Sequence, residues 1–476
     1  MKRHVWVCLA LLLLLMGCGA ASDRRDAPPN GEGNSDAPLL PEPDSAPPND
    51  SPDSPSDACD SQSVCPEDGS SGWVGSWSAA PYGPFPAGPL SQLGPDEVAA
   101  LTTPGAFQGN QARDQSFRMV VNPTLDGDQL RLRFSNLKGD RPVTLEPVRV
   151  ALRALPAVGA SIVPSTDTAV LFDGESQLIM QPGEEAVSDA LVLPFRVGQD
   201  LVISFSVRGE SGPMTWHAVS FDTQFVSAPG SGDRTGDVSG LAYPLLTLGW
   251  FFLTGVDVLR PDALGSMVML GDSITDGAHQ IPATNTRYPD FVARRLQQAG
   301  IAMGVLNQGI NSNTVTLAGD EPFRGPPAVR RFERDVLQRA GVRSVLIFAG
   351  TNDLTVDANA AQIYADIEQL VARAHENGLC VVLGTIPPRD DLLFGWDRDT
   401  MESERQALNA LIRGNREVEG IADFDAVLRN PLLPSRPNPL LFFPDLLHPQ
   451  SLGFAAMANA VPLSALVPAP AGDCRR

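Results

Sequence analysis

The feature that most constrains the fold is the regular exchange of apolar runs and helical patterns after Pro261. Short apolar runs, which predict strands, stand at 267–270, 303–306, 342–350 and 379–388. Amphipathic patterns, which predict helices, stand at 288–298, 329–338, 361–378, 400–415 and 452–460. Strands that alternate with helices form a parallel sheet with helices on both faces. Ligands bind such sheets beyond the carboxyl ends of the strands, so a site is expected at that edge.

The preceding residues, 72–260, carry a different pattern. In the segment DQLRLRF, Leu130, Leu132 and Phe134 alternate with polar residues, which is typical of a strand with one buried face. Further short runs of this kind follow, separated by Gly, Pro and Asp. This spacing predicts an antiparallel β-sandwich of the jelly-roll kind, followed by the α/β domain at 261–476.

The N-terminus is predicted to be a targeting segment. After two basic residues, the apolar stretch Val5–Met16 is too short to span a bilayer as a helix. It leads into Leu15–Cys18, which resembles a bacterial lipobox with Cys18 as the lipidated residue. Residues 1–17 are then a lipoprotein signal peptide, and Gly19 favours an outer-membrane or cell-surface location. If the lipobox is not used, the protein is expected to be secreted.

Residues 18–71 are predicted to be a disordered tether. They are rich in Pro, Asp and Ser, with few residues that could form a core. Twelve acidic residues against two arginines place about half of the formal net charge of −21 in this segment. A nucleic-acid partner is disfavoured, because binding phosphates needs the opposite charge.

The six cysteines do not follow the spacing of a metal site, and no metal or cofactor is expected. Cys59 and Cys65 close a short loop at the end of the tether and are predicted to form a disulfide in an exported chain. Cys380 lies in an apolar strand and is interpreted as a small buried hydrophobic residue. Cys474 has no obvious partner.

The stretch GDSITDG at 271–277 raises the question of whether Ser273 is a nucleophile. An apolar run ends here in turn-forming residues, so an ordinary strand-to-loop junction explains the stretch equally well. A nucleophilic serine also needs a base, an acid that orients the base, and donors for an oxyanion.

Elimination among the five histidines leaves His448 as the candidate base. His4 lies in the signal peptide, His217 in the β region and His375 on a helix face. His279 lies in the loop after Ser273, where it could line the site. Asp445 stands three residues before His448, so both side chains lie on one side of a single turn. That Asp could hold the imidazole and leave its other nitrogen to take the serine proton. Taken alone, the segment could also be a solvated turn before the last helix.

Two further strand ends offer candidate oxyanion donors. Asn352 follows one strand and supplies an uncharged NH₂ group. Gly309 ends another, where a glycine would let a substrate approach the backbone N–H.

Together these segments resemble the SGNH, or GDSL-type, hydrolase family, over residues 261–462. The matching positions are Gly271, Asp272, Ser273, Gly309, Gly350, Asn352, Asp353, Asp445 and His448. The resemblance implies a flavodoxin-like α/β/α fold, Ser273 as nucleophile, Asp445 and His448 as its partners, and an oxyanion hole of Ser273, Gly309 and Asn352. Ser312 departs from the family, where a second glycine is often found.

The β region resembles the domain that precedes the catalytic domain in exported bacterial members, several of which are similar to carbohydrate esterases. We therefore expect an exported serine esterase that removes acetyl or other short acyl groups, chiefly from carbohydrate. Two alternatives remain open: a lysophospholipase or thioesterase, and a non-catalytic envelope protein that binds glycans.

Trp396 is a candidate substrate contact. It lies among charged residues in the segment 387–400, which follows a strand and should reach the catalytic rim. A flat ring among polar groups suits stacking on a pyranose. Alternatively, the ring packs with neighbouring apolar residues and fixes the loop.

Overall fold

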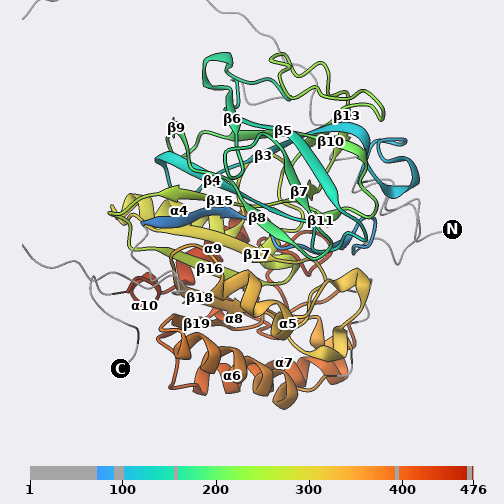
Figure 1. Cartoon of the computed structure of the whole chain (residues 1–476). Helices are drawn as coiled ribbons and strands as arrows, with labels where there is room; N and C mark the ends of the chain where they lie inside the picture. The colour runs from blue at the N-terminus through green and yellow to red at the C-terminus, as the bar shows by residue number, and fades with distance from the viewer. Residues whose placement is uncertain are drawn as a thin grey trace, which may run out of the picture. The chain divides into compact units, whose positions relative to one another are not determined.

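The computed structural model describes residues 72–89, 101–154, 159–356, 358–391, 396–468 and 474. The predicted signal peptide, the tether, the anchor Cys18 and the Cys59–Cys65 disulfide lie outside these residues. Ser71–Arg476 form one compact unit that contains both the β region and the α/β region (Figure 1). In the part of the chain that is described, no helix has the length and apolar character needed to cross a membrane.

The described residues of the β region form three antiparallel sheets. Their orders are β1-β15-β4-β8 with β9 beside β4, β13-β12-β3-β10-β5-β6 with β7 beside β5, and β14-β11-β2. The bounds are β1 Trp73–Ser78, β2 Gly83–Pro84, β3 Arg113–Val121, β4 Gly127–Ser135, β5 Val143–Leu152, β6 Thr168–Val170, β7 Leu178–Met180, β8 Glu185–Val187, β9 Leu191–Phe195, β10 Leu201–Glu210, β11 Thr215–His217, β12 Gln224–Val226, β13 Leu245–Thr247, β14 Trp250–Phe251 and β15 Leu253–Leu259. The prediction of an antiparallel β region is confirmed.

The alternation in β4 works as the sequence predicts. Leu130, Leu132 and Phe134 are fully buried in the β core. The intervening Arg131 and Arg133 face the other side, where both guanidinium groups bind Asp257 Oδ2 on β15, at 2.9 and 2.8 Å. The period-two pattern therefore separates the apolar face from a cross-strand ion pair.

The α/β region is built on a parallel sheet of order β17-β16-β18-β19-β20. Its strands are β16 Ser266–Gly271, β17 Gly304–Gly309, β18 Val342–Phe348, β19 Cys380–Gly384 and β20 Gly420–Ala422. Its helices are α3 Ser273–Asp276, α4 Tyr288–Gln298, α5 Ala328–Phe332, α6 Ala360–Glu376, α7 Arg398–Gly414, α8 Phe424–Leu428, α9 Ser451–Ala460 and α10 Leu463–Leu466. In chain order the strands run 2-1-3-4-5, which is the flavodoxin-like arrangement that the family resemblance implied.

The helices form two groups, one for each face of this sheet. Helix α9 packs against α4 and α8, whereas α6 packs against α5 and α7 (Figure 1). One predicted helix differs from the sequence pattern: α5 ends at Phe332, and a π-helical turn continues it over Glu333–Leu337. The three-layer α/β/α architecture is confirmed.

The β region packs directly on the edge strand of this sheet. The backbone of β1 comes so close to β17 that a Cβ on Gly304 would lie 1.9 Å from the carbonyl oxygen of Gly75. Nearby, Val305 N–H donates to Thr124 Oγ1 at 2.9 Å. Backbone contact and hydrogen bonds therefore join the two regions without an intervening spacer.

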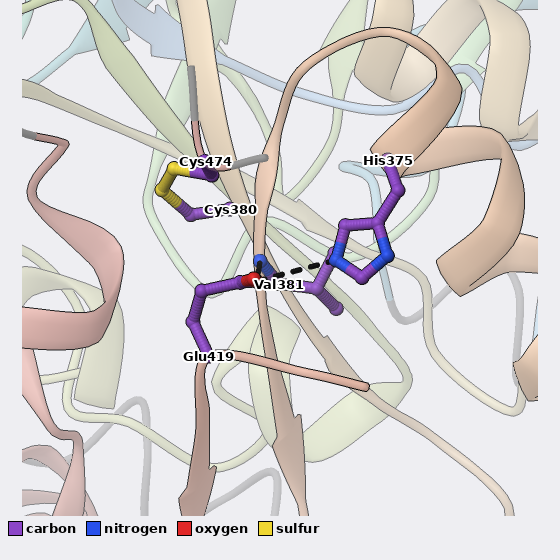
Figure 2. Close-up of a disulfide and its surroundings, with 5 residues drawn as sticks. All are labelled: His375, Cys380, Val381, Glu419 and Cys474. Atoms are coloured by element: carbon purple, nitrogen blue, oxygen red, sulfur yellow. Dashed lines mark hydrogen bonds and ion pairs between the residues drawn. A yellow bond between two sulfur atoms is a disulfide. The ribbon is translucent and has the colours of Figure 1, made fainter. Parts of the chain in front are cut away.

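A disulfide that the sequence did not predict joins Cys380 on β19 to Cys474, with Cα atoms 4.9 Å apart (Figure 2). The interpretation of Cys380 as only a small hydrophobic residue is therefore incomplete, and Cys474 has a partner. The two residues are 94 positions apart, so only the folded chain brings them together. Figure 2 also shows Glu419 Oε2 accepting from the Val381 N–H at 2.6 Å and lying 3.3 Å from His375 Nε2.

Candidate active site

Ser273 lies where the central strand of the parallel sheet turns into a helix. Strand β16 ends at Gly271, and Ser273 is the first residue of α3. Asp272 caps this helix, because its Oδ1 accepts the Ile274 N–H at 3.0 Å. A Cβ at Gly271 would lie 2.0 Å from Thr275 Oγ1, so only glycine permits this tight junction. The junction fixes Ser273 at the carboxyl edge of the sheet.

Asp272 is a structural cap and not the acid of a catalytic group. Its side chain is completely buried, and burial raises its pKa to about 7, although the Ile274 N–H opposes this shift. Its carboxyl group bonds to the helix start, whereas the carboxylate that reaches a histidine belongs to Asp445.

The structure brings Ser273, His448 and Asp445 together. Ser273 Oγ lies 2.9 Å from His448 Nε2, and His448 Nδ1 lies 2.7 Å from Asp445 Oδ2. The other carboxylate oxygen of Asp445 accepts the backbone N–H groups of Leu447 and His448, each at 3.1 Å. One turn therefore orients both the acid and the base, as the spacing predicted.

Burial and nearby charges shift the pKa values of His448 and Asp445 in directions that suit proton transfer from Ser273. Burial lowers the pKa of His448, as do the charges of His279 and Arg389, and together they outweigh the opposing effect of Asp445. Burial alone would raise the pKa of Asp445, but His448 and His279 hold it well below its usual range. His448 is therefore neutral near pH 7, as a general base must be, and Asp445 is ionised.

His279 also reaches this group, which the sequence suggested only as a lining role. Its Nε2 lies 3.4 Å from Asp445 Oδ2, and its ring centroid lies 5.0 Å from that of His448. The side chain is 35% exposed and adopts a left-handed backbone with φ of 67°. Asp445 therefore faces two histidines, one buried and one partly exposed.

Gly309 does not offer a free N–H, contrary to the prediction from sequence. Its N–H donates to Asn307 Oδ1 at 2.8 Å. The glycine is required for a different reason: a Cβ at this position would lie 2.2 Å from the backbone nitrogen of Asp276 and 2.8 Å from the carbonyl carbon of Thr275. Gly309 therefore lets the end of β17 pack on the backbone of α3.

The backbone N–H of Ser312 is available in its place. Ser312 has a φ of 64°, and its N–H has no acceptor among the residues that the structure describes. The adjacent Asn313 carbonyl accepts from Asn352 Nδ2 at 2.9 Å, which holds the Asn352 amide beside this turn. Ser312 stands where related sequences often have glycine, and a left-handed φ explains that preference. In the sequence, the sign of the Ser312 N–H donor was that Ser312 stands at a position where the family often has glycine.

Asp353 ties the turn to the end of β18. Its carboxylate accepts the N–H of Thr316 at 2.9 Å and that of Val315 at 3.0 Å. Burial raises the pKa of Asp353, although these N–H groups oppose the shift. In the Gly-x-Asn-Asp segment, Asn352 therefore lies at the site, whereas Asp353 holds the backbone at Val315 and Thr316 in place.

Trp396 is not available for stacking on a sugar. Only 8% of the residue is exposed, and it packs within the core of the α/β region. The guanidinium of Arg389 lies over its ring, 5.0 Å from the centroid. This burial favours the alternative, in which the ring packs with apolar residues, over a contact with substrate.

One group in the described part of the chain could hold a metal ion: His279, Asp445 and His448, with ligand atoms within 4.8 Å of one another. Asp445 Oδ2 and His448 Nδ1 are already hydrogen-bonded to each other, so a cation at this place would compete with that contact.

Part of the chain is similar to known proteins. Residues 269–456 match the model of the GDSL-like Lipase/Acylhydrolase family. No curated protein matches the chain. A GDSL-like lipase from Bacteroides thetaiotaomicron is 20% identical, and the match covers 42% of this chain and 87% of that one, with a TM-score of 0.33. A carbohydrate acetylesterase family member from Sinorhizobium meliloti is 18% identical, covering 42% and 96%, with a TM-score of 0.33.

Substitutions at Gly309 and Ser312 test the two roles assigned above. Gly309→Ala forces a methyl group onto the backbone of α3, so we expect a loss of about 1–3 kcal/mol in unfolding free energy and reduced hydrolysis. Ser312→Gly relieves a left-handed backbone and should raise the thermal midpoint. Thermal denaturation and initial rates measure both. Full stability in Gly309→Ala would contradict the packing role.

The charge of His279 can be tested by the pH dependence of hydrolysis. Because this charge lowers the pKa of His448, His279→Ala should raise that pKa. A base must be neutral to work, so the acid limb of kcat/KM should move to higher pH. The control is His375→Ala, which removes a histidine that pairs with Glu419 instead. An unmoved limb, or one displaced to lower pH, would contradict the assignment.

Proposed function

We propose that this chain, whose residues 269–456 form a domain of the GDSL-like lipase/acylhydrolase family, is an exported serine esterase that acts on short acyl esters. The observation that carries the proposal is the unbroken chain from Ser273 Oγ to His448 Nε2 at 2.9 Å and from His448 Nδ1 to Asp445 at 2.7 Å. A serine held this way is activated as a nucleophile.

The reaction follows from the positions of these atoms. Ser273 Oγ attacks the ester carbonyl while its proton passes to His448 Nε2, and Asp445 stabilises the imidazolium that forms. The carbonyl oxygen becomes an oxyanion. When this tetrahedral species collapses, the alcohol leaves with the proton from His448. Water then hydrolyses the acyl-enzyme by the same route, with His448 again as the base.

The oxyanion is held by the backbone N–H groups of Ser273 and Ser312 and by the side-chain amide of Asn352. Ser273 N–H stands at the first position of α3, where a helix offers no internal acceptor. Ser312 N–H and the second N–H of Asn352 have no partner among the described residues. Donors that are fixed before reaction stabilise the charge without reorganisation.

Exposure around the nucleophile supports a small acyl group. Ser273 and His448 expose only 6% and 7% of their surface, so a short acyl group reaches Oγ most easily. The imidazole of His279 lies next to His448, which suits an alcohol portion rich in hydroxyl groups. Acylated carbohydrate is therefore our first choice of substrate.

One observation favours a lipolytic enzyme as the second candidate. The segment between α8 and α9, which carries Asp445 and His448, exposes Leu432 by 88%, Leu433 by 60% and Leu440 by 73%. Large apolar side chains exposed near a site are typical of surfaces that meet lipid or protein.

Chain-length profiling separates the two candidates. With p-nitrophenyl esters from acetate to palmitate, a short-acyl esterase should show a steep fall in kcat/KM beyond butyrate. A maximum at laurate or palmitate would overturn the short-acyl assignment in favour of the lipolytic one.

The nucleophile is tested with Ser273→Ala and p-nitrophenyl acetate. The variant should lose roughly 10⁴-fold or more in kcat while keeping the thermal midpoint. A fluorophosphonate probe should label the wild type and not the variant, which also excludes the non-catalytic glycan-binding alternative. Equal rates for both proteins would refute the mechanism.

Export and lipid anchoring through Cys18 are part of the proposal. The Cys380–Cys474 disulfide supports an oxidising compartment, since such bonds persist mainly outside the cytoplasm. Wild-type protein should fractionate with membranes, and Cys18→Ala should release it to the soluble fraction. Retention of the variant on washed membranes would count against the anchor.

A further inference from the structure

The β region reaches the catalytic helix through a buried ion pair. His217 on β11 donates from Nδ1 to the Ala80 carbonyl at 2.9 Å, and its Nε2 lies 3.0 Å from Asp276 Oδ1. Both side chains are at least 95% buried. Asp276 is the last residue of α3, three positions after Ser273. The pair therefore links the β region to the helix that carries the nucleophile.

The carboxylate of Asp276 also bonds to the turn that carries Ser312. Its second oxygen accepts from Asn311 Nδ2, and Arg287 Nε donates to the Asp276 backbone carbonyl at 2.8 Å. Burial would lower the pKa of His217, but Asp276 and the Ala80 carbonyl raise it overall, against the opposing charge of Arg287. Asp276 therefore favours the protonated form of His217, in which one ring N–H donates to the Ala80 carbonyl and the other to Asp276.

Tyr82 makes the most direct contact with that turn. Its hydroxyl, which carries one hydrogen, lies within hydrogen-bond distance of two acceptors, the Asn311 carbonyl at 2.9 Å and the Phe323 carbonyl. Its backbone N–H donates to the Trp216 carbonyl at 2.8 Å, which fixes Tyr82 beside His217. Only 1% of Tyr82 is exposed.

The Asn311 carbonyl and the Ser312 N–H belong to one peptide unit. That unit is planar, so a hydrogen bond that fixes the carbonyl also fixes the direction of the N–H. Donation to the carbonyl further polarises the N–H, because linked hydrogen bonds strengthen one another. The contact with Tyr82 therefore bears on both the direction and the polarisation of the Ser312 N–H.

We propose that the β region completes the oxyanion site, with Tyr82 and His217 as positioning residues for the 311–312 peptide and for α3. This rests on the proposed function, because it assigns a purpose to the Ser312 N–H. The β region is then a required part of the catalytic unit. Other contacts between the regions, such as Thr124 with Val305, lie away from this turn and hold the regions together.

Tyr82→Phe is the decisive variant, since it removes one hydroxyl and keeps the ring. The matched control is Tyr243→Phe, which loses a buried tyrosine hydroxyl that donates to the Arg234 carbonyl at 3.0 Å elsewhere in the β region. A second control, Thr124→Val, weakens the contact between the regions at another point. All three are made in the full chain.

We expect Tyr82→Phe to lower kcat for p-nitrophenyl acetate about tenfold with KM nearly unchanged, as for a small misplacement of a catalytic group. Inhibition by phenylboronic acid, which forms a tetrahedral adduct with an active serine, should weaken by a similar factor. The controls should lower the thermal midpoint without this effect on kcat or on boronate inhibition.

His217 gives an independent check. His217→Gln keeps a donor near the position of Nε2 and should retain more kcat than His217→Phe, which leaves Asp276 without it. Full kcat and full boronate inhibition in Tyr82→Phe, with an active wild type, would overturn this inference alone. Equal rates for wild type and Ser273→Ala would overturn the proposed function, and the inference with it.

Discussion

The central strand β16 is the constraint on which the rest of the site depends. All six of its residues are buried, and it pairs with β17 on one side and β18 on the other. Parallel strands bring their carboxyl ends to one edge, so the ends of β16, β17 and β18 deliver Ser273, the 310–313 turn and Asn352 to the same place. The glycines at two of these ends, Gly271 and Gly309, serve close packing around α3. The site is therefore compact, because the ends of β16 and β17 pack closely on α3.

Within that frame, the electrostatics depend on a single carboxylate. Asp445 is bonded to two backbone N–H groups and to His448, and it also faces His279. The backbone bonds hold its orientation, and its bond to Nδ1 directs His448 Nε2 toward Ser273. His279 places a partly exposed imidazole next to the base, outside the hydrogen bonds that join Ser273, His448 and Asp445.

The β region and the C-terminal cysteine show how distant segments stabilise this arrangement. His217 and Tyr82 belong to the β region, yet their partners are Asp276 at the end of α3 and Asn311 in the turn after β17. A buried carboxylate without partners would be costly, so the folding of one region depends on the presence of the other. At the far side of the sheet, the Cys380–Cys474 disulfide ties the end of the chain to β19.

The succession of strands and helices, and the choice of Ser273, His448 and Asp445 as candidate site residues, could be predicted from the sequence, because each depends on local spacing or on a side chain of a particular type. The remaining features depend on tertiary structure. A backbone N–H such as that of Ser312 has no side-chain signature, and a glycine such as Gly309 reads the same whether it makes room for a substrate or for a neighbouring backbone. The burial of Trp396, the pairing of Cys380 with Cys474, and the contact of His217 with Asp276 depend on segments far apart in the chain. Local pattern cannot encode such contacts, since they exist only once the core has closed around them.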